Sequence, residues 1–465
     1  MRCWISMTTL CIASLAVAGC STPEKRGLAF SGATTAERVQ LLVDETWTDA
    51  EGQRHVDQEI FDSVFAMIDE AEEFILIDLF LVNDFLFEPG PEMRPLSKEL
   101  TERLLVKRKT HPNLPITFIT DPLNTVYQSV EAPHFTAMQQ AGIQVVWTNL
   151  DRLRDTNPIY SKPWRLFAKP WGTGPGEAYK NPIGEGRISR RSMYKLLNFK
   201  ANHRKVVVTE KSLLVMSANP HDASSAHWNV ALRVDGAGME LAWQAESAIL
   251  RLSDAEPAHE PVFRRTTSPS ENRLLLLTER KIKDHALELL AHAGSGTRID
   301  LTMFYFSEKD LKKAFIAAQQ RGCKVRVILD PNKDAFGRIK NGIPNRQTAA
   351  KLVQAGIPLR WADTHGEQCH TKMLYVEHAD LTASLLLGSC NYTRRNTDTL
   401  NAECDLAYRA PVGDPNMERA RHLFDRWWTN ADGRIYTTDY STYEDPSVRR
   451  KIRAWLMEAT GFSTF

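Results

Sequence analysis

The sequence lacks an excess of charge of either sign. Its 465 residues contain 58 Lys and Arg against 57 Asp and Glu, which leaves a formal net charge of +1. Domains that bind nucleic acid usually carry a clear basic excess. The composition therefore gives no global argument for nucleic-acid binding, and any basic site must be local. A chain of this length can form two or three domains with a sizeable core.

Cysteine is scarce and shows no metal-binding pattern. Of seven cysteines, four lie beyond the first 20 residues, and these are Cys323, Cys369, Cys390 and Cys404. None forms a CxxC pair or the Cys/His spacing typical of zinc sites. We expect no metal and no other cofactor. Export would permit disulfides among the four, but buried free thiols are the simpler expectation, and the sequence specifies no pairing.

Long apolar runs are missing except at the N-terminus. Arg2 precedes "CWISMTTLCIASLAVAG", which is too short to span a bilayer comfortably. This segment ends in "LAVAGC", and small residues before Cys20 resemble the lipobox of bacterial lipoproteins. The resemblance implies a signal peptide over 1–19, a lipidated Cys20 and a tether over 20–40. The alternative is an ordinary signal peptide with a cysteine nearby.

The same resemblance implies a location. No later segment is apolar enough to span a bilayer, so any membrane attachment would be through lipid on Cys20. Ser21 follows the cysteine. In Gram-negative lipoproteins a residue other than aspartate there implies sorting to the outer membrane. We therefore expect a lipid-anchored protein of the bacterial cell envelope, on the periplasmic side.

The rest of the chain repeats itself. Four segments occur twice in the same order. The pairs are "FILIDLFL" (74–81) with "RIDLTMFY" (298–305), "ITFITDPLN" (116–124) with "VRVILDPNK" (325–333), "QAGIQVVW" (140–147) with "QAGIPLRW" (354–361), and "NHRKVVVTE" (202–210) with "CHTKMLYVE" (369–377). The first pair aligns Asp78 with Asp300. Repetition in order indicates one ancestral lobe used twice.

Each copy alternates helical and strand patterns. In the second copy, amphipathic segments such as "EKDLKKAFIAAQQRG" separate continuous apolar runs such as "KVRVILD". Continuous apolar strands between helices predict a largely parallel sheet covered on both faces. The fold class is therefore α/β, with two homologous lobes packed with pseudo-twofold symmetry.

Spacing gives the domain boundaries. His203 follows Gly142 by 61 positions, whereas His370 follows Gly356 by 14, so the first copy carries about 47 extra residues. We place this insertion at about 148–195. The lobes are predicted at 41–253 and 273–465. The Pro-containing stretch 254–272 is the predicted linker.

The repeated HxK segment carries the most chemistry. On a strand, side chains two positions apart share a face. His203 with Lys205, and His370 with Lys372, should therefore reach the same space from each lobe. Small polar residues follow in both copies, at "SANP" (217–220) and "GSCN" (388–391). Two such lobes meeting at a pseudo-twofold axis would bring both sets to one seam.

Paired HxK motifs, each followed by a carboxylate and then by GSxN, resemble the phospholipase D superfamily. The resemblance covers about residues 41–430. It implies metal-free cleavage of a phosphodiester by a nucleophile, a general acid and cations on the non-bridging oxygens. It also implies His203 as the nucleophile that forms a phosphohistidine, and His370 as the acid/base. The residues alone leave these two roles interchangeable.

The resemblance implies further site residues. The lysines would hold the phosphate together with four small polar residues, which are Ser217, Asn219, Ser389 and Asn391. Supporting carboxylates would be Glu210 and Glu377, where the family usually has aspartate. Family members often carry a glutamate that orients the opposing histidine. Glu403 supplies one in the second lobe.

Two positions depart from the family pattern. Asn229 stands where the first lobe would carry the orienting glutamate, and an amide cannot stabilise an imidazolium by charge. Met216 stands at the glycine of GSxN. Four other histidines lie near the motifs, and we expect them to be solvated or structural. They are His221, His227, His365 and His378.

Two segments bear on the substrate. Between Lys162 and Lys195 the insertion carries eight Lys or Arg and two Glu, interleaved with Trp and Tyr. Such a mixture suits a lipid headgroup interface, but it also suits single-stranded nucleic acid, and a solvated loop is equally compatible. The segment 330–347, with Lys333, Arg338 and Lys340, is either a substrate loop or a surface turn.

The sequence therefore predicts a phosphodiesterase or phosphatidyltransferase acting on membrane phospholipid, either by hydrolysis to phosphatidic acid or by transfer to an alcohol as in cardiolipin synthesis. No nucleic-acid partner is expected. Two alternatives remain: a periplasmic nuclease of the same superfamily, and a membrane-tethered scaffold without catalysis, suggested by Asn229 and Met216.

Overall fold

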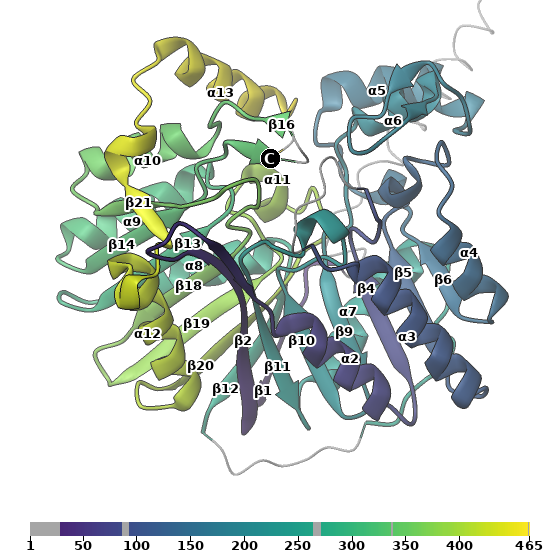
Figure 1. Ribbon diagram of the computed structural model, residues 1–465, viewed down its shortest axis with the longest axis horizontal. Helices are drawn as coiled ribbons and strands as arrows, with labels where there is room; N and C mark the ends of the chain where they lie inside the picture. The colour runs from purple at the N-terminus through teal and green to yellow at the C-terminus, as the bar shows by residue number, and fades with distance from the viewer. Residues whose placement is uncertain (1–27, 86–92, 264–270, 336–337, 464) are drawn as a thin grey trace, which may run out of the picture.

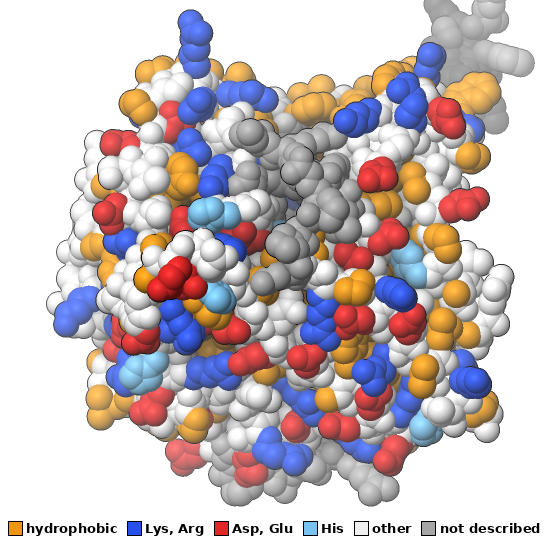
Figure 2. All heavy atoms as spheres, in the orientation of Figure 1, with side chains coloured by type: hydrophobic (Ala, Val, Ile, Leu, Met, Phe, Trp, Pro, Cys, Tyr) orange, Lys and Arg blue, Asp and Glu red, His pale blue; other side chains and the backbone are white. Residues whose placement is uncertain are grey.

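The computed structural model describes residues 28–85, 93–263, 271–335, 338–463 and 465. Two large sheets stand side by side, with helices on their outer faces (Figure 1). The predicted signal peptide and Cys20 lie outside the described residues and stay predictions. Among the described residues, no helix has the length and apolarity needed to span a bilayer. Charges of both signs are interspersed over much of the face seen in Figure 2, consistent with the small net charge.

The first lobe is built on an eight-stranded sheet. In spatial order its strands are β3 (Arg54–Asp57), β2 (Arg38–Thr48), β11 (Asn229–Asp235), β10 (Ser212–Met216), β9 (Lys205–Thr209), β4 (Ile75–Leu79), β5 (Ile116–Thr120) and β6 (Gln144–Trp147). The helices of this lobe are α2 (Ile60–Glu70), α3 (Leu96–Thr110), α4 (Pro133–Gln140) and α7 (Met239–Leu252), with short turns η2 (Pro122–Thr125) and η5 (Asp222–Ser224).

The second lobe is built on a nine-stranded sheet. In spatial order its strands are β1 (Ser31–Thr35), β12 (Arg273–Thr278), β20 (Cys404–Pro411), β19 (Thr382–Gly388), β18 (Lys372–Glu377), β13 (Arg298–Met303), β14 (Lys324–Leu329), β17 (Leu359–Ala362) and β21 (Thr437–Asp439). Its helical elements are α8 (Arg280–His292), α9 (Lys309–Gln320), α10 (Asn345–Gln354), α11 (Arg394–Thr397), α12 (Pro415–Thr429), η6 (Ala431–Gly433), η7 (Tyr440–Tyr443) and α13 (Val448–Thr460), and a small hairpin joins β15 (Asp334–Ala335) to β16 (Arg338–Ile339).

Seven strands follow the same spatial order in both sheets. From β2 to β6 the first sheet runs 2-11-10-9-4-5-6, and from β12 to β17 the second runs 12-20-19-18-13-14-17. This agreement confirms the α/β fold built from two similar lobes. The expectation of mostly parallel sheets is wrong. Only β4-β5-β6 and β13-β14-β17 are parallel, because helices connect those strands. Short links join β9 to β10 and β18 to β19, and a short link requires an antiparallel pair.

The register corrects one sequence alignment. Lys205 pairs with Leu79, and Lys372 pairs with Met303, so Leu79 corresponds to Met303. Asp78 therefore corresponds to Thr302 and not to Asp300. A shift of two residues keeps every side chain on the same face of a strand. The apolar pattern alone consequently could not reveal it.

Three apolar cores hold the molecule together. One lies under the outer helices of each lobe. The third is shared between the lobes, where residues of β9 and β10 join residues of β18 and β19 together with α7 and α12. Trp228 of the first lobe and Trp427 of the second pack there with ring centroids 5.2 Å apart. The lobes are thus fixed to each other by buried apolar contacts.

The insertion forms a small separate layer at one end of the molecule (Figure 1). Its elements are η3 (Leu150–Arg152), α5 (Pro158–Phe167), η4 (Lys169–Trp171), β7 (Tyr179–Lys180), β8 (Arg187–Ile188) and α6 (Arg190–Leu196). The structure bears on the predicted bounds of the tether and the linker. Ser31–Thr35, which we assigned to the tether, instead forms β1 and pairs with β12. In the predicted linker, residues 255–263 form no helix or strand, and 264–270 lie outside the described residues.

A buried ion cluster joins the lobes behind the repeated motifs. Arg204, the middle residue of the first HxK, is fully buried. One of its terminal nitrogens lies 3.3 Å from Glu246 of α7, and the other donates to Glu279 of the second lobe at 2.7 Å. The same Glu279 oxygen accepts the backbone N–H of Glu403 at 3.1 Å. The arginine therefore fixes the segment that carries Glu403.

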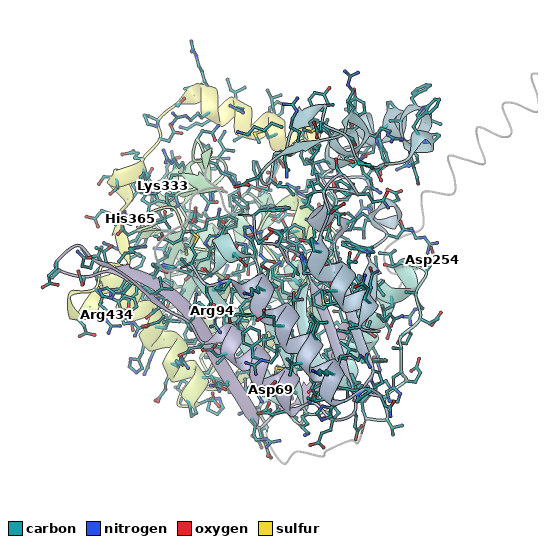
Figure 3. All side chains as sticks on the ribbon, turned by 45° about the vertical axis from the view of Figure 1, so that its right-hand side comes forward. Asp69, Arg94, Asp254, Lys333, His365 and Arg434 are labelled. Atoms are coloured by element: carbon teal, nitrogen blue, oxygen red, sulfur yellow. The ribbon has the colours of Figure 1, made fainter. Side chains whose placement is uncertain are left out.

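We expect Arg204→Met to lower the free energy of unfolding by about 3–5 kcal/mol, because it leaves two buried carboxylates without their cation. Urea denaturation measures this loss. The matched control is Arg103→Met, which removes an exposed ion pair with Asp69 on the outside of α2 (Figure 3). Its cost should stay within about 1 kcal/mol. Equal effects of the two variants would contradict the prediction.

Candidate active site

The two HxK segments meet at the seam between the lobes. His203 and His370 each stand two residues before β9 and β18 begin. The backbone N–H of His203 donates to Ala402 of the second lobe at 2.8 Å. Reciprocally, the N–H of Trp228 in the first lobe donates to Gln368, two residues before His370, at 3.0 Å. Each histidine is therefore held by backbone of the opposite lobe.

Each imidazole is oriented by a side chain from the other lobe. Nδ1 of His203 lies 2.9 Å from the Glu403 carboxylate, and Nδ1 of His370 lies 3.2 Å from the Asn229 carbonyl oxygen. An amide oxygen only accepts hydrogen bonds, so Nδ1 of His370 carries the proton. With Nδ1 engaged in both rings, Nε2 is the nitrogen available for chemistry. The departure at Asn229 therefore preserves orientation and removes only the charge.

The lysines lie directly behind the histidines. Nζ of Lys205 donates to the His203 carbonyl and Nζ of Lys372 to the His370 carbonyl, each at 2.7 Å. Nζ lies 5.2 Å from the Phe80 ring in the first lobe and 5.0 Å from the Phe304 ring in the second. Each ring also meets the edge of its histidine at 4.9 Å. The lysines thus place positive charge beside both imidazoles.

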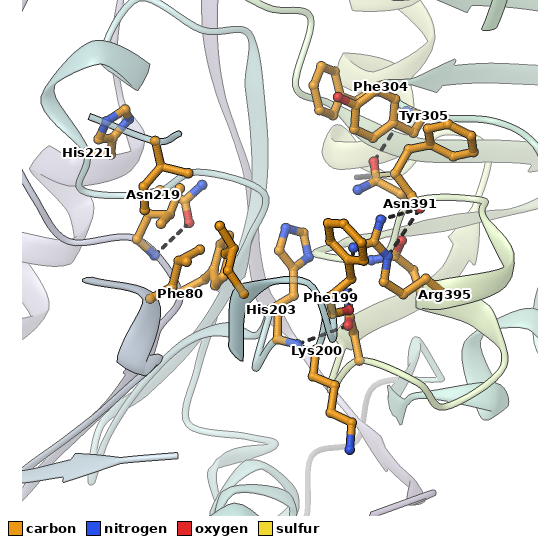
Figure 4. A pocket seen from close by; sticks show the side chains of 18 of the residues that line it. Phe80, Phe199, Lys200, His203, Asn219, His221, Phe304, Tyr305, Asn391 and Arg395 are labelled. Carbon is orange, nitrogen blue, oxygen red and sulfur yellow. Dashed lines mark hydrogen bonds between the residues drawn. The ribbon is translucent and has the colours of Figure 1, made fainter. Parts of the chain in front are cut away.

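The predicted asparagines face a shared cavity. Asn219 and Asn391 both line it. Their carbonyl oxygens accept backbone N–H groups, from Leu81 at 3.4 Å and from Tyr305 at 3.3 Å. This pairing leaves the amide NH₂ groups as donors for an anion. In the view of Figure 4, His203 lies between Asn219 and Asn391.

The assignment of Ser217 and Ser389 to phosphate binding is corrected. Both residues are fully buried. The Ser217 hydroxyl donates to the Asn229 carbonyl at 3.0 Å, and the Ser389 hydroxyl donates to the Glu403 carboxylate. Their hydrogen bonds are directed at the groups that orient the histidines. The serines therefore position Asn229 and Glu403 and do not contact the cavity.

Glu210 and Glu377 lie far from the histidines. They stand at the opposite ends of β9 and β18, seven residues along, a separation of about 23 Å in an extended strand. Glu210 accepts the backbone N–H of Glu72 at 2.8 Å, and Glu377 accepts the hydroxyl of Tyr375 at 3.1 Å. Their role is to support the strands.

Burial and the lysines control the protonation of the site. Burial, followed by the charges of Lys205 and Lys372, holds the pKa of His203 well below its ordinary value. Burial and Lys372 do the same to the pKa of His370. Burial also raises the pKa of Glu403 to about 7 and lowers the pKa of Lys205 to about 7. Neutral imidazole is thus the favoured form of both histidines.

The cavity has a volume of about 550 Å³ and largely apolar walls. The two histidines and the two asparagines are among its lining residues. Residues of the insertion and of the segment that precedes His203 supply much of the apolar lining, namely Pro182, Ile183, Met193, Leu196, Leu197 and Phe199. The second lobe adds Phe304, Tyr305 and Phe465. The insertion therefore closes one wall of the active site.

The sequence did not reveal the role of two aspartates that position the HxK segments. The Asp121 carboxylate accepts the backbone N–H of Asn202 at 2.8 Å, and the Asp330 carboxylate accepts that of Cys369 at 2.8 Å. Each aspartate thus fixes the residue before a histidine. Both belong to the repeated "DP" dipeptide, which we used only as evidence of duplication. The repeat was the signal that could have identified them.

Further polar groups reach the cavity. His221 and His227, which we expected to be solvated or structural, are buried and line it, whereas His365 and His378 lie outside its lining. Arg395 also lines it and was not predicted. Lys340 of the predicted substrate loop lines it too, and its Nζ contacts the Tyr305 hydroxyl.

Among the described residues, the cysteines form neither a disulfide nor part of a metal site. The four cysteines predicted as buried free thiols are confirmed as such. Among residues 28–85, 93–263, 271–335, 338–463 and 465, no group of three or more His, Cys, Asp or Glu side chains is arranged to hold a metal ion.

The electrostatic role of Lys205 is testable by NMR. Lys205 is charged below pH 7, the range in which His203 titrates, so Lys205→Met should raise the pKa of the His203 imidazole. A pH titration of protein labelled with ¹³C-histidine measures this pKa. Comparison with His203→Gln identifies the signal of His203. Lys211→Met, at the exposed far end of β9, is the matched control and should leave the pKa unchanged. An unchanged or lowered pKa in Lys205→Met would refute this role.

Comparisons with known proteins bear on this geometry. Residues 287–428 match the family described as cardiolipin synthase, PLD-like domain. No curated protein shows significant sequence similarity to the chain. Phosphatidylserine synthase of Haemophilus influenzae Rd KW20 is similar in structure, with a TM-score of 0.55 at 11% identity, covering 94% of this chain and 97% of that one.

Two other likenesses are weaker. Polyphosphate kinase of Porphyromonas gingivalis has a TM-score of 0.46 at 12% identity, covering 92% of this chain and 54% of that one. Nuc of Salmonella typhimurium, a phospholipase D family member, has a TM-score of 0.28 at 20% identity, covering 36% of this chain and 98% of that one. Neither adds to the argument. The matched domain contains the second HxK motif, so residues 287–428 are similar to a phospholipase D-like domain, and the chain as a whole has a fold similar to that of phosphatidylserine synthase.

Proposed function

We propose that the protein cleaves or exchanges phosphodiester bonds of membrane phospholipids through a phosphohistidine intermediate. The match of residues 287–428 to a phospholipase D-like domain supports an enzyme that acts on phosphodiesters. The pairing of His203 and His370 at one seam supports covalent catalysis with a separate acid/base. The family match to cardiolipin synthase and the structural likeness to phosphatidylserine synthase favour a lipid substrate.

The observation that carries the proposal is the apolar cavity beside the histidines. A phospholipid presents an anionic diester next to long apolar chains, and the cavity offers amide donors next to apolar walls. A nuclease would need cations free to follow a polynucleotide backbone. Three Lys or Arg side chains line the cavity. Lys200 is paired with Asp155, and Lys340 contacts the Tyr305 hydroxyl. The Arg395 guanidinium donates to backbone oxygens of Ser463 and Phe465. The cavity is therefore better suited to lipid than to nucleic acid.

The phosphate would be held between the lobes. The amide groups of Asn219 and Asn391 would donate to its non-bridging oxygens, one from each side. The charges of Lys205 and Lys372, buried behind the histidines, would stabilise the negative charge that develops in the transition state. Because these groups are already fixed by hydrogen bonds, little reorganisation is needed on reaction.

In the first step, Nε2 of His203 attacks phosphorus and forms the P–N bond while the bond to the leaving alcohol breaks. The phosphorylated imidazole carries positive charge, and Glu403 at Nδ1 can stabilise it. His370 gives the leaving oxygen a proton from Nε2. His370 is neutral in the free protein and would take up this proton in the substrate complex, where the anionic phosphodiester opposes the lowering of its pKa by burial. Asn229 offers no such charge, so a protonated His370 is a strong acid. This asymmetry supports His203 as nucleophile and His370 as acid/base.

In the second step, His370 removes a proton from an incoming hydroxyl, whose oxygen attacks phosphorus and displaces Nε2 of His203. Water as the incoming group gives phosphatidic acid. An alcohol gives a new phosphatidyl ester, and a second phospholipid with a free hydroxyl would give cardiolipin. In both cases the second step restores neutral His203 and protonated His370.

The two departures from the family pattern are compatible with activity. Met216 lies buried in the apolar core of the first lobe, so it replaces no catalytic group. In the second lobe a Cβ at Gly388 would lie 2.4 Å from the Cys404 carbonyl, which explains the glycine there. Asn229 still orients His370. These contacts favour an enzyme over an inactive scaffold. A lipid anchor on Cys20 would keep the enzyme at the envelope membrane.

We expect wild-type protein to form phosphatidic acid or cardiolipin from mixed anionic phospholipids, and His203→Ala or His370→Ala to lower the rate by at least about a thousandfold. Thin-layer chromatography of labelled lipid measures the products. Mass spectrometry after acid-free quenching should find the phosphatidyl adduct on His203 in His370→Ala.

The control and the contrary outcomes are distinct. His365→Ala, outside the cavity lining, should retain activity. An adduct on His370 would reverse the assigned roles. Nicking of plasmid DNA with inert lipid would establish the nuclease instead, and no turnover of either substrate would favour the scaffold.

A further inference from the structure

Two helical segments at one end of the molecule expose apolar faces. One consists of α5 with η4 from the insertion, and the other is α13. Figures 1 and 3, which differ by a 45° rotation, both show them along the same edge of the molecule. Orange and blue side chains alternate along this edge in Figure 2.

The apolar stripe of α13 points away from the protein. None of its residues is buried, although Ala454 and Met457 pack against a small apolar cluster that contains Phe304 and Tyr305. Helical periodicity places Ile452, Trp455 and Leu456 on the opposite side of the helix from that contact. Trp455 is 60% exposed and Ile452 is 54% exposed. A helix that served only to cover the cluster would not need this second face.

The insertion exposes a similar surface. Trp164 of α5 faces inward and is buried. The other side of α5 carries Ile159 and Leu166, which are 81% and 66% exposed. Phe167 at the end of the helix is 76% exposed, and η4 adds Trp171 at 73%. These residues are large, apolar and adjacent along two consecutive elements. Single exposed apolar residues are ordinary, but a contiguous set marks an interaction surface.

The two segments adjoin each other and the cavity. Gly461 caps the C-terminus of α13, and Thr156 precedes the N-cap of α5. The two residues lie so close together that a Cβ at Gly461 would be 2.2 Å from the Thr156 carbonyl oxygen. The rings of Phe462 and Phe199 meet edge to face at 5.2 Å, and Phe199 lines the cavity. The exposed apolar faces are therefore neighbours of the active-site wall.

The charge of this end is almost entirely positive. The elements α5, η4, α6 and α13 carry two, one, three and four Lys or Arg residues, ten in all, and a single acid, Glu458. Glu458 accepts the Ser307 hydroxyl at 2.9 Å. Six of the cations form no ion pair with a described residue, and these are Lys162, Arg190, Arg191, Arg449, Lys451 and Arg453. The whole chain has a net charge of +1, so the rest of the chain is net negative and this positive excess is local.

We propose that α5, η4, α6 and α13 form a docking surface for a bilayer that contains anionic phospholipids. Exposed Trp and aliphatic side chains would enter the interfacial region, while Lys and Arg would bind the headgroups. A second copy of the chain would bring like charges together, and protein interfaces are depleted in Lys. The composition therefore fits a lipid surface best. Docking there would set the cavity wall against the bilayer that holds the substrate.

The proposed function gives the docking surface its purpose, so the inference rests on that function, but the binding experiment tests the surface without it. Vesicle co-sedimentation measures binding directly, with full-length protein carrying Cys20→Ser so that a lipid anchor cannot contribute. Vesicles of phosphatidylcholine alone are compared with equal parts of phosphatidylcholine and phosphatidylglycerol. We expect binding to the anionic vesicles that weakens as salt is raised.

Separate variants test α13 and the α5–η4 segment, and they separate the apolar contribution to binding from the electrostatic one. Ile452→Ser with Trp455→Ser, and Phe167→Ser with Trp171→Ser, should each lower the vesicle partition coefficient at least tenfold. Arg449→Gln with Arg453→Gln should lower binding to anionic vesicles and reduce its salt dependence. The matched control, Val106→Ser with Leu381→Ser, changes two residues that are equally exposed but lie outside the surface, and should bind as wild type.

The contrary outcomes are equally concrete. Variants that bind vesicles as well as wild type would overturn the docking surface, as would variants whose only change is in oligomeric state by light scattering. Activity measurements test the docking surface separately from the proposed function. The apolar variants should lose turnover of vesicle lipid but keep turnover of a short-chain phospholipid dissolved as monomers. If wild type turns over neither substrate, the proposed function fails while the binding result still decides the docking surface.

Discussion

The hydrogen bond from each histidine to an acceptor in the opposite lobe is the contact on which the active site depends. Neither lobe contains both a histidine and the group that orients it. Glu403 reaches His203 and Asn229 reaches His370 only when the two sheets are packed through their shared core. The buried Arg204–Glu279 pair fixes the backbone of Glu403, so the lobe interface and the catalytic geometry are a single arrangement.

Duplication supplies symmetry, and a few residues break it. The aspartates before the histidines, the lysines behind them and the phenylalanines beside them occur in equivalent positions in both lobes. A symmetric site would give both histidines equal chemistry. The carboxylate of Glu403 against the amide of Asn229 removes that equality, because only the carboxylate can stabilise a charged imidazole. The insertion also makes the two halves of the site unequal, because it forms a cavity wall on one side only.

Burial acts on every charged group of the site in the same direction. It lowers the pKa of the histidines and lysines and raises the pKa of Glu403, and thereby keeps neutral imidazole available at ordinary pH. The apolar wall that causes this burial is also the feature that suits a lipid. The insertion thus contributes to the chemistry through its walls and, with α13, presents the basic and aromatic end of the molecule.

The sequence determined the α/β class, the two lobes and the residues that bear the chemistry, because a duplicated pattern shows itself as repeated letters in order. It could not determine strand direction in the sheet, since apolar runs look alike in parallel and antiparallel pairs. It could not show that Asp78 and Asp300 are not equivalent positions, because a shift of two residues along a strand leaves each side chain on the same face. It placed Ser217 and Ser389 on the phosphate, whereas packing turned them toward Asn229 and Glu403. Which lobe orients which histidine, and what lines the cavity, depend on contacts between residues about 140 to 200 positions apart. Only the tertiary structure decides those, because local propensity carries no information about partners so distant along the chain.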